Sequence, residues 1–105
     1  IILRVAVLNR AAFEFDAHAP IAAREGVAAA KIAAVKDGVI GDLFDARERQ
    51  VLALTDAMTR DITVPPALMA ALQQAYDARG LVELVTTVAA YNMVSRILVA
   101  CTLTP

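Results

Sequence analysis

The order of apolar and polar positions predicts a chain built from helices. Residues 1–8 are apolar on every side except at Arg4, a pattern that fits a buried strand and a buried helix equally well. Good helix formers dominate residues 11–35, and Gly26 and Gly38 are the natural ends of two helices within and after this stretch. The first third of the chain therefore predicts short helices separated by glycine.

Start signals for further helices follow in the rest of the chain. Pro20 interrupts the first alanine-rich helix, where we expect a kink or a break because proline removes the hydrogen bond to the carbonyl of Asp16. Asp45 and Glu48 have the spacing of a capping box, which predicts a helix from there to about Arg60. The run Val64-Pro65-Pro66 predicts the start of another helix. Asp77 is the expected N-cap of the last and longest helix, which runs to about Cys101. Together these signals predict six helical segments joined by short links.

Composition narrows the class of protein. The chain has 105 residues, of which 59% are hydrophobic, and 23 are alanine. This excludes a disordered chain, and the length supports one domain covering residues 1–105. So small a domain cannot hide this many apolar side chains, so we expect a membrane, a partner or further copies of the chain to cover the surplus.

Charge argues against one further class of protein, and cysteine usage excludes another. The formal net charge of −1 lacks the basic excess of a nucleic-acid-binding protein. The single cysteine excludes an internal disulfide and so a disulfide-stapled secreted domain.

A membrane span is disfavoured by the most apolar stretch itself. Residues 81–103 contain Glu83, Asn92 and Arg96, so no uncharged run reaches the roughly 18 residues that a spanning helix needs. The chain opens without a signal-peptide pattern, and we expect a cytoplasmic protein. Because the sequence begins at Ile1 rather than Met, we also expect it to be a piece of a longer protein, with an N-terminal extension missing from it.

Glu14 and His18 are the first candidates for chemistry. His18 is the one histidine, and it follows Glu14 by four residues, so both project from one face of a helix. A carboxylate beside an imidazole orients the ring for acid–base catalysis. An ordinary surface ion pair, worth at most about 1 kcal/mol, has the same spacing and stays an alternative.

The last predicted helix supplies the second group of candidates. Asn92 lies in the middle of an apolar stripe, so its amide needs hydrogen-bond partners from a neighbouring helix or from a ligand. Arg96, one turn later, could pair with Glu14, bind a substrate carboxylate or form a salt bridge between subunits. Tyr91 fits a core aromatic or a pocket wall.

Cys101 has no basic neighbour, and we expect a buried, inert thiol. No metal-ligand spacing or phosphate-binding loop is present in the sequence.

Several segments resemble the carboxymuconolactone decarboxylase family over nearly the whole chain. The most specific are an aromatic-Glu-aromatic-x-x-His string at residues 13–18 and Tyr-Asn-Met-Val at residues 91–94. The other matching segments are Leu3–Leu8, His18–Ala22, Glu25–Val27, Phe44–Arg49 and Leu81–Leu84. The resemblance implies an all-α fold of the alkylhydroperoxidase D type with about six helices, assembled as a homotrimer or homohexamer. It also implies that the ambiguous first segment is a helix.

The same family contains a redox branch, which carries a Cys-x-x-Cys pair followed after three residues by His. Aligned on His18, the two cysteine positions fall on Ala11 and Glu14. Peroxidase chemistry needs a reactive thiolate and a resolving thiol, and both are missing from these positions. The resemblance is therefore to the non-redox branch, and antioxidant activity is a disfavoured alternative.

The non-redox branch implies a cofactor-free lyase that removes a carboxylate from a small lactone acid during the breakdown of aromatic compounds. By family position, Glu14 and His18 are the catalytic candidates for proton transfer. Tyr91, Asn92 and Arg96 are the candidates for binding a small-molecule carboxylate or a developing oxyanion. A non-catalytic oligomeric binding protein is the remaining alternative.

Overall fold

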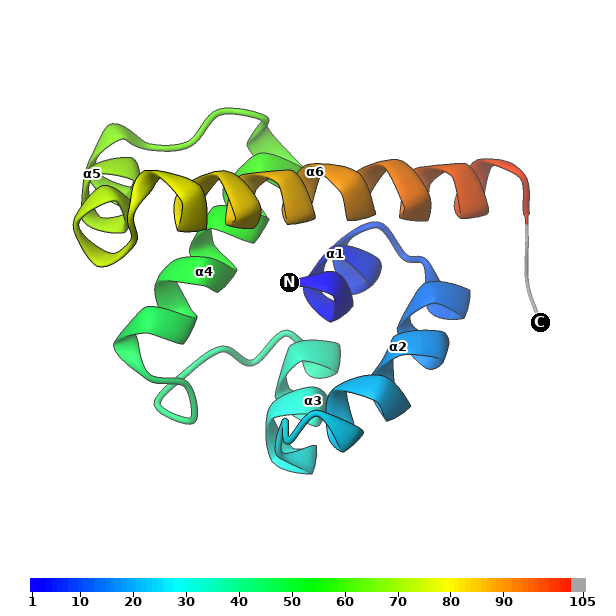
Figure 1. The fold of residues 1–105 in the computed structure, drawn as a ribbon. Helices are drawn as coiled ribbons and strands as arrows, with labels where there is room; N and C mark the ends of the chain where they lie inside the picture. The colour runs from blue at the N-terminus through cyan, green and yellow to red at the C-terminus, as the bar shows by residue number, and fades with distance from the viewer. Residues whose placement is uncertain (103–105) are drawn as a thin grey trace.

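The computed structural model describes residues 1–102, and this part of the chain is helical, without a strand. Six α-helices and one π-helical turn follow one another (Figure 1). They are α1 (Ile2–Leu8), α2 (Ala12–Arg24), α3 (Ala29–Asp37), α4 (Ala46–Asp56), the π-helical turn η1 (Ala57–Asp61), α5 (Pro66–Ala75) and α6 (Ala78–Ala100). The expected all-α fold class is confirmed.

The shortest α-helix lies at the centre of the molecule. α1 contacts α2, α3, α4, η1 and α6, and the other helices surround it in Figure 1. Its residues 3–6 are all buried, including Arg4. A helix that neighbours cover on all sides needs apolar side chains all round, and this explains why residues 1–8 have no polar face.

The predicted starts of the later helices are confirmed by their caps. Asp45 accepts a hydrogen bond from the backbone N–H of Glu48 at 2.8 Å, and the Glu48 carboxylate accepts one from the N–H of Asp45 at 3.1 Å, which completes the capping box. Asp77 caps α6 by accepting from the N–H of Gly80 at 2.7 Å. Pro66 is the first residue of α5.

Two expectations about breaks in the alanine-rich region had different outcomes. Gly38 ends α3 in the left-handed conformation, with φ of 75°, as its position predicted. A break at Pro20 was wrong, because α2 continues through it to Arg24. Pro20 and Asp16 are both exposed, so water can hydrate the carbonyl that loses its partner.

The predicted helix to Arg60 changes its winding near its end. α4 stops at Asp56 and the chain continues as η1, after which Ile62 takes a φ of 68°. π-helical turns are rare and often occur at functional sites. This turn carries Thr59, which is buried and points its hydroxyl to α6.

One buried apolar cluster lies beneath the site. It lies between α1, α2, α3 and α4, and comprises Leu3, Ala6, Ala11, Phe15, Val35, Phe44 and Leu52. Elsewhere in the core, the largest fully buried apolar side chains are Val5, Leu54, Leu72 and Val88.

α6 crosses the molecule and leaves much of its surface uncovered. By length and composition alone it could cross a membrane, with a mean hydropathy of 1.3 in its best window. It packs against α1, α2, α4, α5 and η1, and one such helix does not by itself indicate a membrane protein. Its last turn extends past the other helices (Figure 1), and Cys101 at its end is exposed, so the expected burial of this thiol was wrong.

Candidate functional site

The centre of the candidate site is a pair of a carboxylate and an imidazole on α2. The Nδ1 atom of His18 lies 3.1 Å from the Oε1 atom of Glu14, one helical turn earlier. The side chain of Glu14 is 7% exposed, whereas that of His18 is 25% exposed. The structure therefore joins a buried carboxylate to an imidazole that is partly open, which is unlike an ordinary surface pair.

The surroundings of Nδ1 determine the tautomer of His18. Nδ1 also lies 3.1 Å from the backbone carbonyl oxygen of Glu14, so both of its neighbours are hydrogen-bond acceptors. Nδ1 then carries the proton and donates it to the carbonyl oxygen, and the Glu14 carboxylate lies close enough to stabilise a positive charge on the ring. The other nitrogen, Nε2, is left with its lone pair in the neutral ring, and it is the atom that can exchange a proton with a substrate.

α6 supplies an aromatic wall for the imidazole. The rings of His18 and Tyr91 meet edge to face, with centroids 5.6 Å apart and an interplanar angle of 84°. This geometry is favourable for aromatic rings, and it restricts rotation of the imidazole. Tyr91 is half-buried, so packing against the rest of the protein limits the movement of its side chain.

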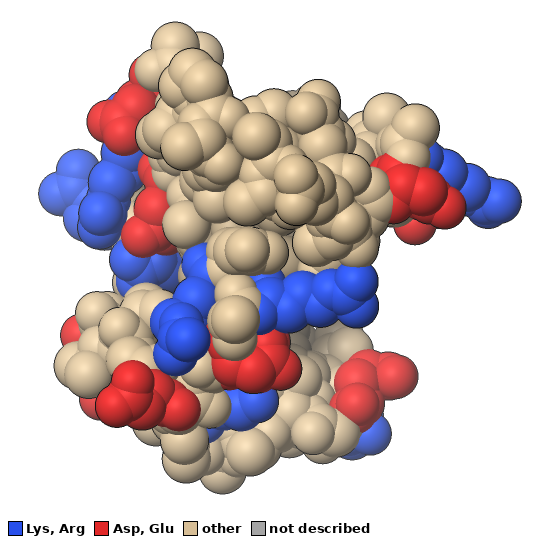
Figure 2. Space-filling model, turned by 90° about the vertical axis from the view of Figure 1, so that its left-hand side faces the viewer, with Lys and Arg blue, Asp and Glu red and all other residues tan. Residues whose placement is uncertain are grey.

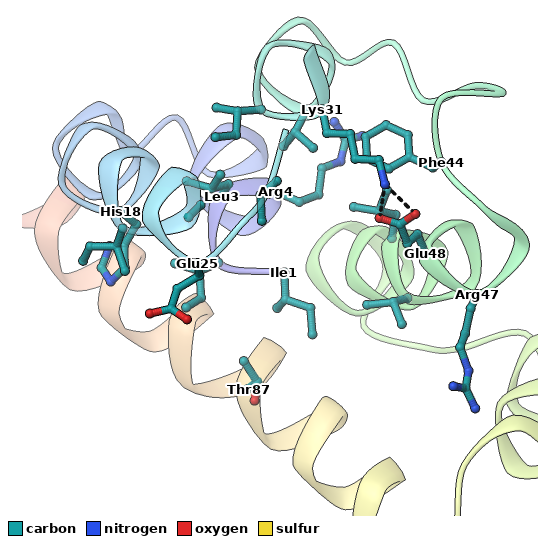
Figure 3. Close-up of a pocket in the computed structure, with 18 of the residues that line it drawn as sticks. Ile1, Leu3, Arg4, His18, Glu25, Lys31, Phe44, Arg47, Glu48 and Thr87 are labelled. Carbon is teal, nitrogen blue, oxygen red and sulfur yellow. Dashed lines mark hydrogen bonds and ion pairs between the residues drawn. The ribbon is translucent and has the colours of Figure 1, made fainter. Parts of the chain in front are cut away.

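His18 opens onto a cavity of about 560 Å³. Figure 3 shows His18 and Glu25 at one end of it, and Lys31, Glu48 and Arg47 toward the other. Much of the wall is apolar, formed by Ile1, Leu3, Ile21, Val35, Phe44 and Leu52 among others. Its size and apolar walls with a few polar groups are typical of small-molecule sites.

Two of the cations at this cavity are already paired with carboxylates. Arg4 is held by Asp56 through two hydrogen bonds of 2.7 and 2.9 Å, which raise the pKa of the guanidinium although burial opposes this. Lys31 donates to both oxygens of Glu48 at 2.8 and 2.9 Å. These two pairs neutralise their own charge at the cavity wall.

Arg47 is held differently. Its guanidinium donates to the carbonyl of Ala75 at 2.7 Å and lies 4.7 Å from the centroid of the Tyr76 ring, and among the described residues it has no carboxylate partner. It is exposed at the edge of the cavity. Figure 2 shows basic side chains, with acidic ones among them, in a band across the side of the molecule that faces left in Figure 1.

Asn92 is the hub of a separate polar network. Its Nδ2 donates to the hydroxyl of Thr59 and to the carbonyl of Val88, both at 3.0 Å, and its Oδ1 accepts from Asn9 at 2.9 Å and from the Nε of Arg96 at 3.4 Å. The partners of this partly buried amide thus come from α6, η1 and the end of α1. Asn92 and Arg96 line a second, smaller cavity of about 270 Å³.

The sequence-predicted residues therefore fall into two groups. Glu14, His18 and Tyr91 lie together, with His18 on the larger cavity. Asn92 and Arg96 lie together on the smaller one, and in the described structure Arg96 bonds to Asn92 and to the carbonyl of Thr59 rather than to Glu14.

Sequence reasoning missed Arg47 and the partner of Arg4. For Arg47 one signal was available, because a basic residue in the first turn of a helix opposes the helix dipole and needs another reason to be there. The pairing of Arg4 with Asp56 spans 52 positions, and nothing local indicates it. Among the described residues, no group of three or more His, Cys, Asp or Glu gathers as metal ligands would.

The architecture is that of the alkylhydroperoxidase D-like proteins. The chain superposes on the crystal structure of a protein of unknown function from Agrobacterium tumefaciens, which has been provisionally assigned to antioxidant defence as AhpD. The TM-score is 0.90 at 22% sequence identity, and the match covers 98% of this chain and 72% of the other. No protein-family model matches the sequence, and comparison with curated proteins finds no relative. At this identity the likeness establishes the fold.

Proposed function

We propose that this protein is an acid–base enzyme that decarboxylates a small carboxylated, lactone-type metabolite, or carries out related lyase chemistry, without a cofactor. The observation that carries the proposal is the pair of Glu14 and His18, in which a buried carboxylate lies 3.1 Å from an imidazole at the wall of a cavity. Such a pair serves proton transfer at carbon. The resemblance to the carboxymuconolactone decarboxylases is the second support.

The proposed reaction needs only a proton donor and an electron sink within the substrate. The bond between the substrate carboxylate and its neighbouring carbon breaks, carbon dioxide leaves, and the electron pair delocalises into a conjugated carbonyl as an enolate. The enolate carbon then takes a proton from Nε2 of the His18 imidazolium. The Glu14 carboxylate stabilises the imidazolium before transfer, the backbone carbonyl of Glu14 holds Nδ1–H throughout, and water restores the proton on Nε2.

Antioxidant activity is the second candidate function, and the fold neighbour from Agrobacterium favours it through its provisional assignment. The chain offers little thiol chemistry for it, because Ala11 and Glu14 stand where the redox branch has cysteines. The single thiol, Cys101, is exposed at the end of α6 rather than on α2 beside His18.

Self-association as a homotrimer or homohexamer is part of the proposal. The exposed side chains Val82, Met93 and Ile97 point within about 60° of one direction on α6, as the helical repeat requires, and form an apolar stripe. Apolar stripes of this kind normally lie in subunit contacts. Subunit contacts of this kind would bury part of the excess of apolar residues in the sequence.

The test is an assay of carbon dioxide release from a panel of carboxylated lactones and β-keto acids, run beside a thiol-dependent peroxidase assay. We expect release by the wild-type chain, release reduced by about 10²–10⁴-fold in His18→Gln, and unchanged release by Arg79→Gln, a control at an exposed ion pair. Circular dichroism checks that each variant keeps its helices. Equal turnover by His18→Gln would remove His18 from the mechanism, and peroxidase activity lost in Cys101→Ser would favour the antioxidant function.

A further inference from the structure

We propose that Arg47 anchors a carboxylate of the ligand, with the apolar body of the ligand lying along the cavity toward His18. This carboxylate is not the one that leaves as carbon dioxide, because the carbon that His18 protonates adjoins the departing group. The inference deepens the proposed function, on which it rests for the role of His18. It moves the anchor from Arg96, the arginine that the sequence suggested, to one that lines the same cavity as the imidazole. The ligand class it names is an apolar carboxylic acid.

Charge pairing singles out Arg47 among the cations of the cavity. Arg4 and Lys31 each hold a carboxylate of the protein through two hydrogen bonds. The one hydrogen bond of the Arg47 side chain in the described structure is to a neutral backbone carbonyl, that of Ala75. A guanidinium has five N–H donors, so those left can bind a carboxylate through two parallel hydrogen bonds.

The guanidinium is also fixed in place before a ligand binds. Tyr76, a cavity residue itself, lies with its ring centroid 4.7 Å from the guanidinium carbon, and Ala75 holds one amino group at 2.7 Å. Both contacts limit the rotamers of a side chain that is otherwise exposed and flexible. A preorganised arginine loses less entropy when it binds an anion.

The place of Arg47 in its helix supports a role outside helix stability. It lies two residues after the N-cap Asp45, in the first turn of α4, where the positive end of the helix dipole repels a cation. The same dipole attracts an anion that is bound beside it. Replacing Arg47 by glutamine should therefore leave α4 intact.

The shape of the cavity determines what else the ligand carries. Figure 3 places Arg47 at one end and His18 at the other, with Ile1 and Leu3 between them. A ligand that reaches both ends presents an apolar body to these side chains. A ligand bound to Arg96 would not reach His18 through this cavity, because Arg96 lines the other cavity and donates hydrogen bonds to Asn92 and Thr59.

The test compares 4-phenylbutyrate with its uncharged amide, 4-phenylbutyramide, by isothermal titration calorimetry at low salt. We expect the wild-type chain to bind the acid about tenfold more tightly than the amide, in line with one charge-assisted contact. Arg47→Gln should lose that preference and leave binding of the amide unchanged. Arg47→Lys keeps the positive charge but cannot form two parallel hydrogen bonds, so it should retain part of the preference for the acid. Arg96→Gln should retain all of this preference.

An unchanged preference in Arg47→Gln would overturn the inference, as would loss of the preference in Arg96→Gln or no binding of the acid by the wild-type chain. A merely structural role of Arg47 would weaken binding of acid and amide alike. If Arg47→Gln does not fold, the lysine variant decides by the same ratio. The measurement needs no turnover, so a chain that binds the acid through Arg47 but releases no carbon dioxide would refute the proposed function alone.

Discussion

The rings of His18 and Tyr91 lie edge to face, with centroids 5.6 Å apart, so a residue of α6 holds the imidazole that α2 presents to the cavity. An aromatic pair of this kind contributes about 0.5–1.5 kcal/mol beyond the area that it buries. If it holds the ring in its productive orientation, its loss should slow turnover.

The ring of Tyr91, rather than its hydroxyl, is expected to matter. Tyr91→Phe should keep kcat within about twofold of wild type, whereas Tyr91→Leu should lower kcat by about 2–10-fold, the equivalent of the aromatic contact. Steady-state kinetics on the carbon dioxide assay measure this. Equal rates for the Phe and Leu variants would show that the contact does not orient His18, and loss of activity in the Phe variant alone would assign a role to the hydroxyl.

The pair of Arg4 and Asp56 should contribute strongly to stability. Asp56→Asn leaves the guanidinium of Arg4 buried without its counter-charge, and breaking a buried pair costs about 3–5 kcal/mol. Because the side chain of Asp56 is 28% exposed, we expect a smaller loss of about 2–3 kcal/mol in the free energy of unfolding. Urea unfolding measures it.

The double variant Arg4→Met with Asp56→Asn is the matched control for this pair. It removes the buried charge together with its partner, so it should recover much of the stability that Asp56→Asn loses. A double variant that is no more stable than Asp56→Asn would contradict the account of Arg4 as a buried charge satisfied by Asp56.

Capping of α4 by Asp45 should make stability depend on pH. The hydrogen bond from the backbone N–H of Glu48 lowers the pKa of Asp45 in the folded chain. A carboxyl whose pKa is lower in the folded state stabilises it above the unfolded pKa, and this contribution is lost as the pH falls through the folded pKa. The stability advantage of wild type over Asp45→Asn should therefore shrink from about pH 6 to about pH 2.5.

Thermal unfolding at several pH values measures this difference, with Asp42→Asn as the control for an exposed aspartate that caps no helix. A difference between wild type and Asp45→Asn that stays constant across this pH range would contradict the capping account. So would an equal pH dependence in the Asp42 control.

The elements that sequence predicted well are those with local causes. The capping box of Asp45 and Glu48, the N-cap Asp77 and the stop at Gly38 involve groups only a few residues apart, and all three are found as expected. The central position of α1 depends on the whole fold. Pattern could not separate strand from helix there, and only the family resemblance indicated a helix.

The candidate site shows the same division between local contacts, which the sequence predicts, and contacts that depend on the whole fold. The pairing of Glu14 with His18 follows from helical spacing and is present. Whether His18 faces a cavity depends on α1, α3 and α4, and which arginine shares that cavity depends on how α4 meets α5. For these reasons the sequence suggested Arg96, four residues after Asn92, and gave no weight to Arg47.

The apolar stripe of α6 predicts self-association, and the family resemblance implies three or six copies. Analytical ultracentrifugation should find a trimer or hexamer of the wild-type chain, and a charge in the stripe, as in Met93→Glu or Ile97→Glu, should dissociate it. Val39→Glu, at a side chain that is 68% exposed and outside α6, should have no effect. A wild-type monomer, or an Ile97→Glu variant with unchanged mass, would contradict the assignment of this stripe to a subunit contact.

The central claim is that Glu14 and His18 act as one catalytic unit, and a double-mutant cycle on kcat tests it most directly. General acid–base catalysis contributes about 10²–10⁴-fold, so His18→Gln should reduce carbon dioxide release by that order and Glu14→Gln by a large part of it. Because the carboxylate acts through the imidazole, the double variant should be no slower than His18→Gln. Losses that multiply in the double variant, or a Glu14→Gln variant as fast as wild type, would contradict the claim.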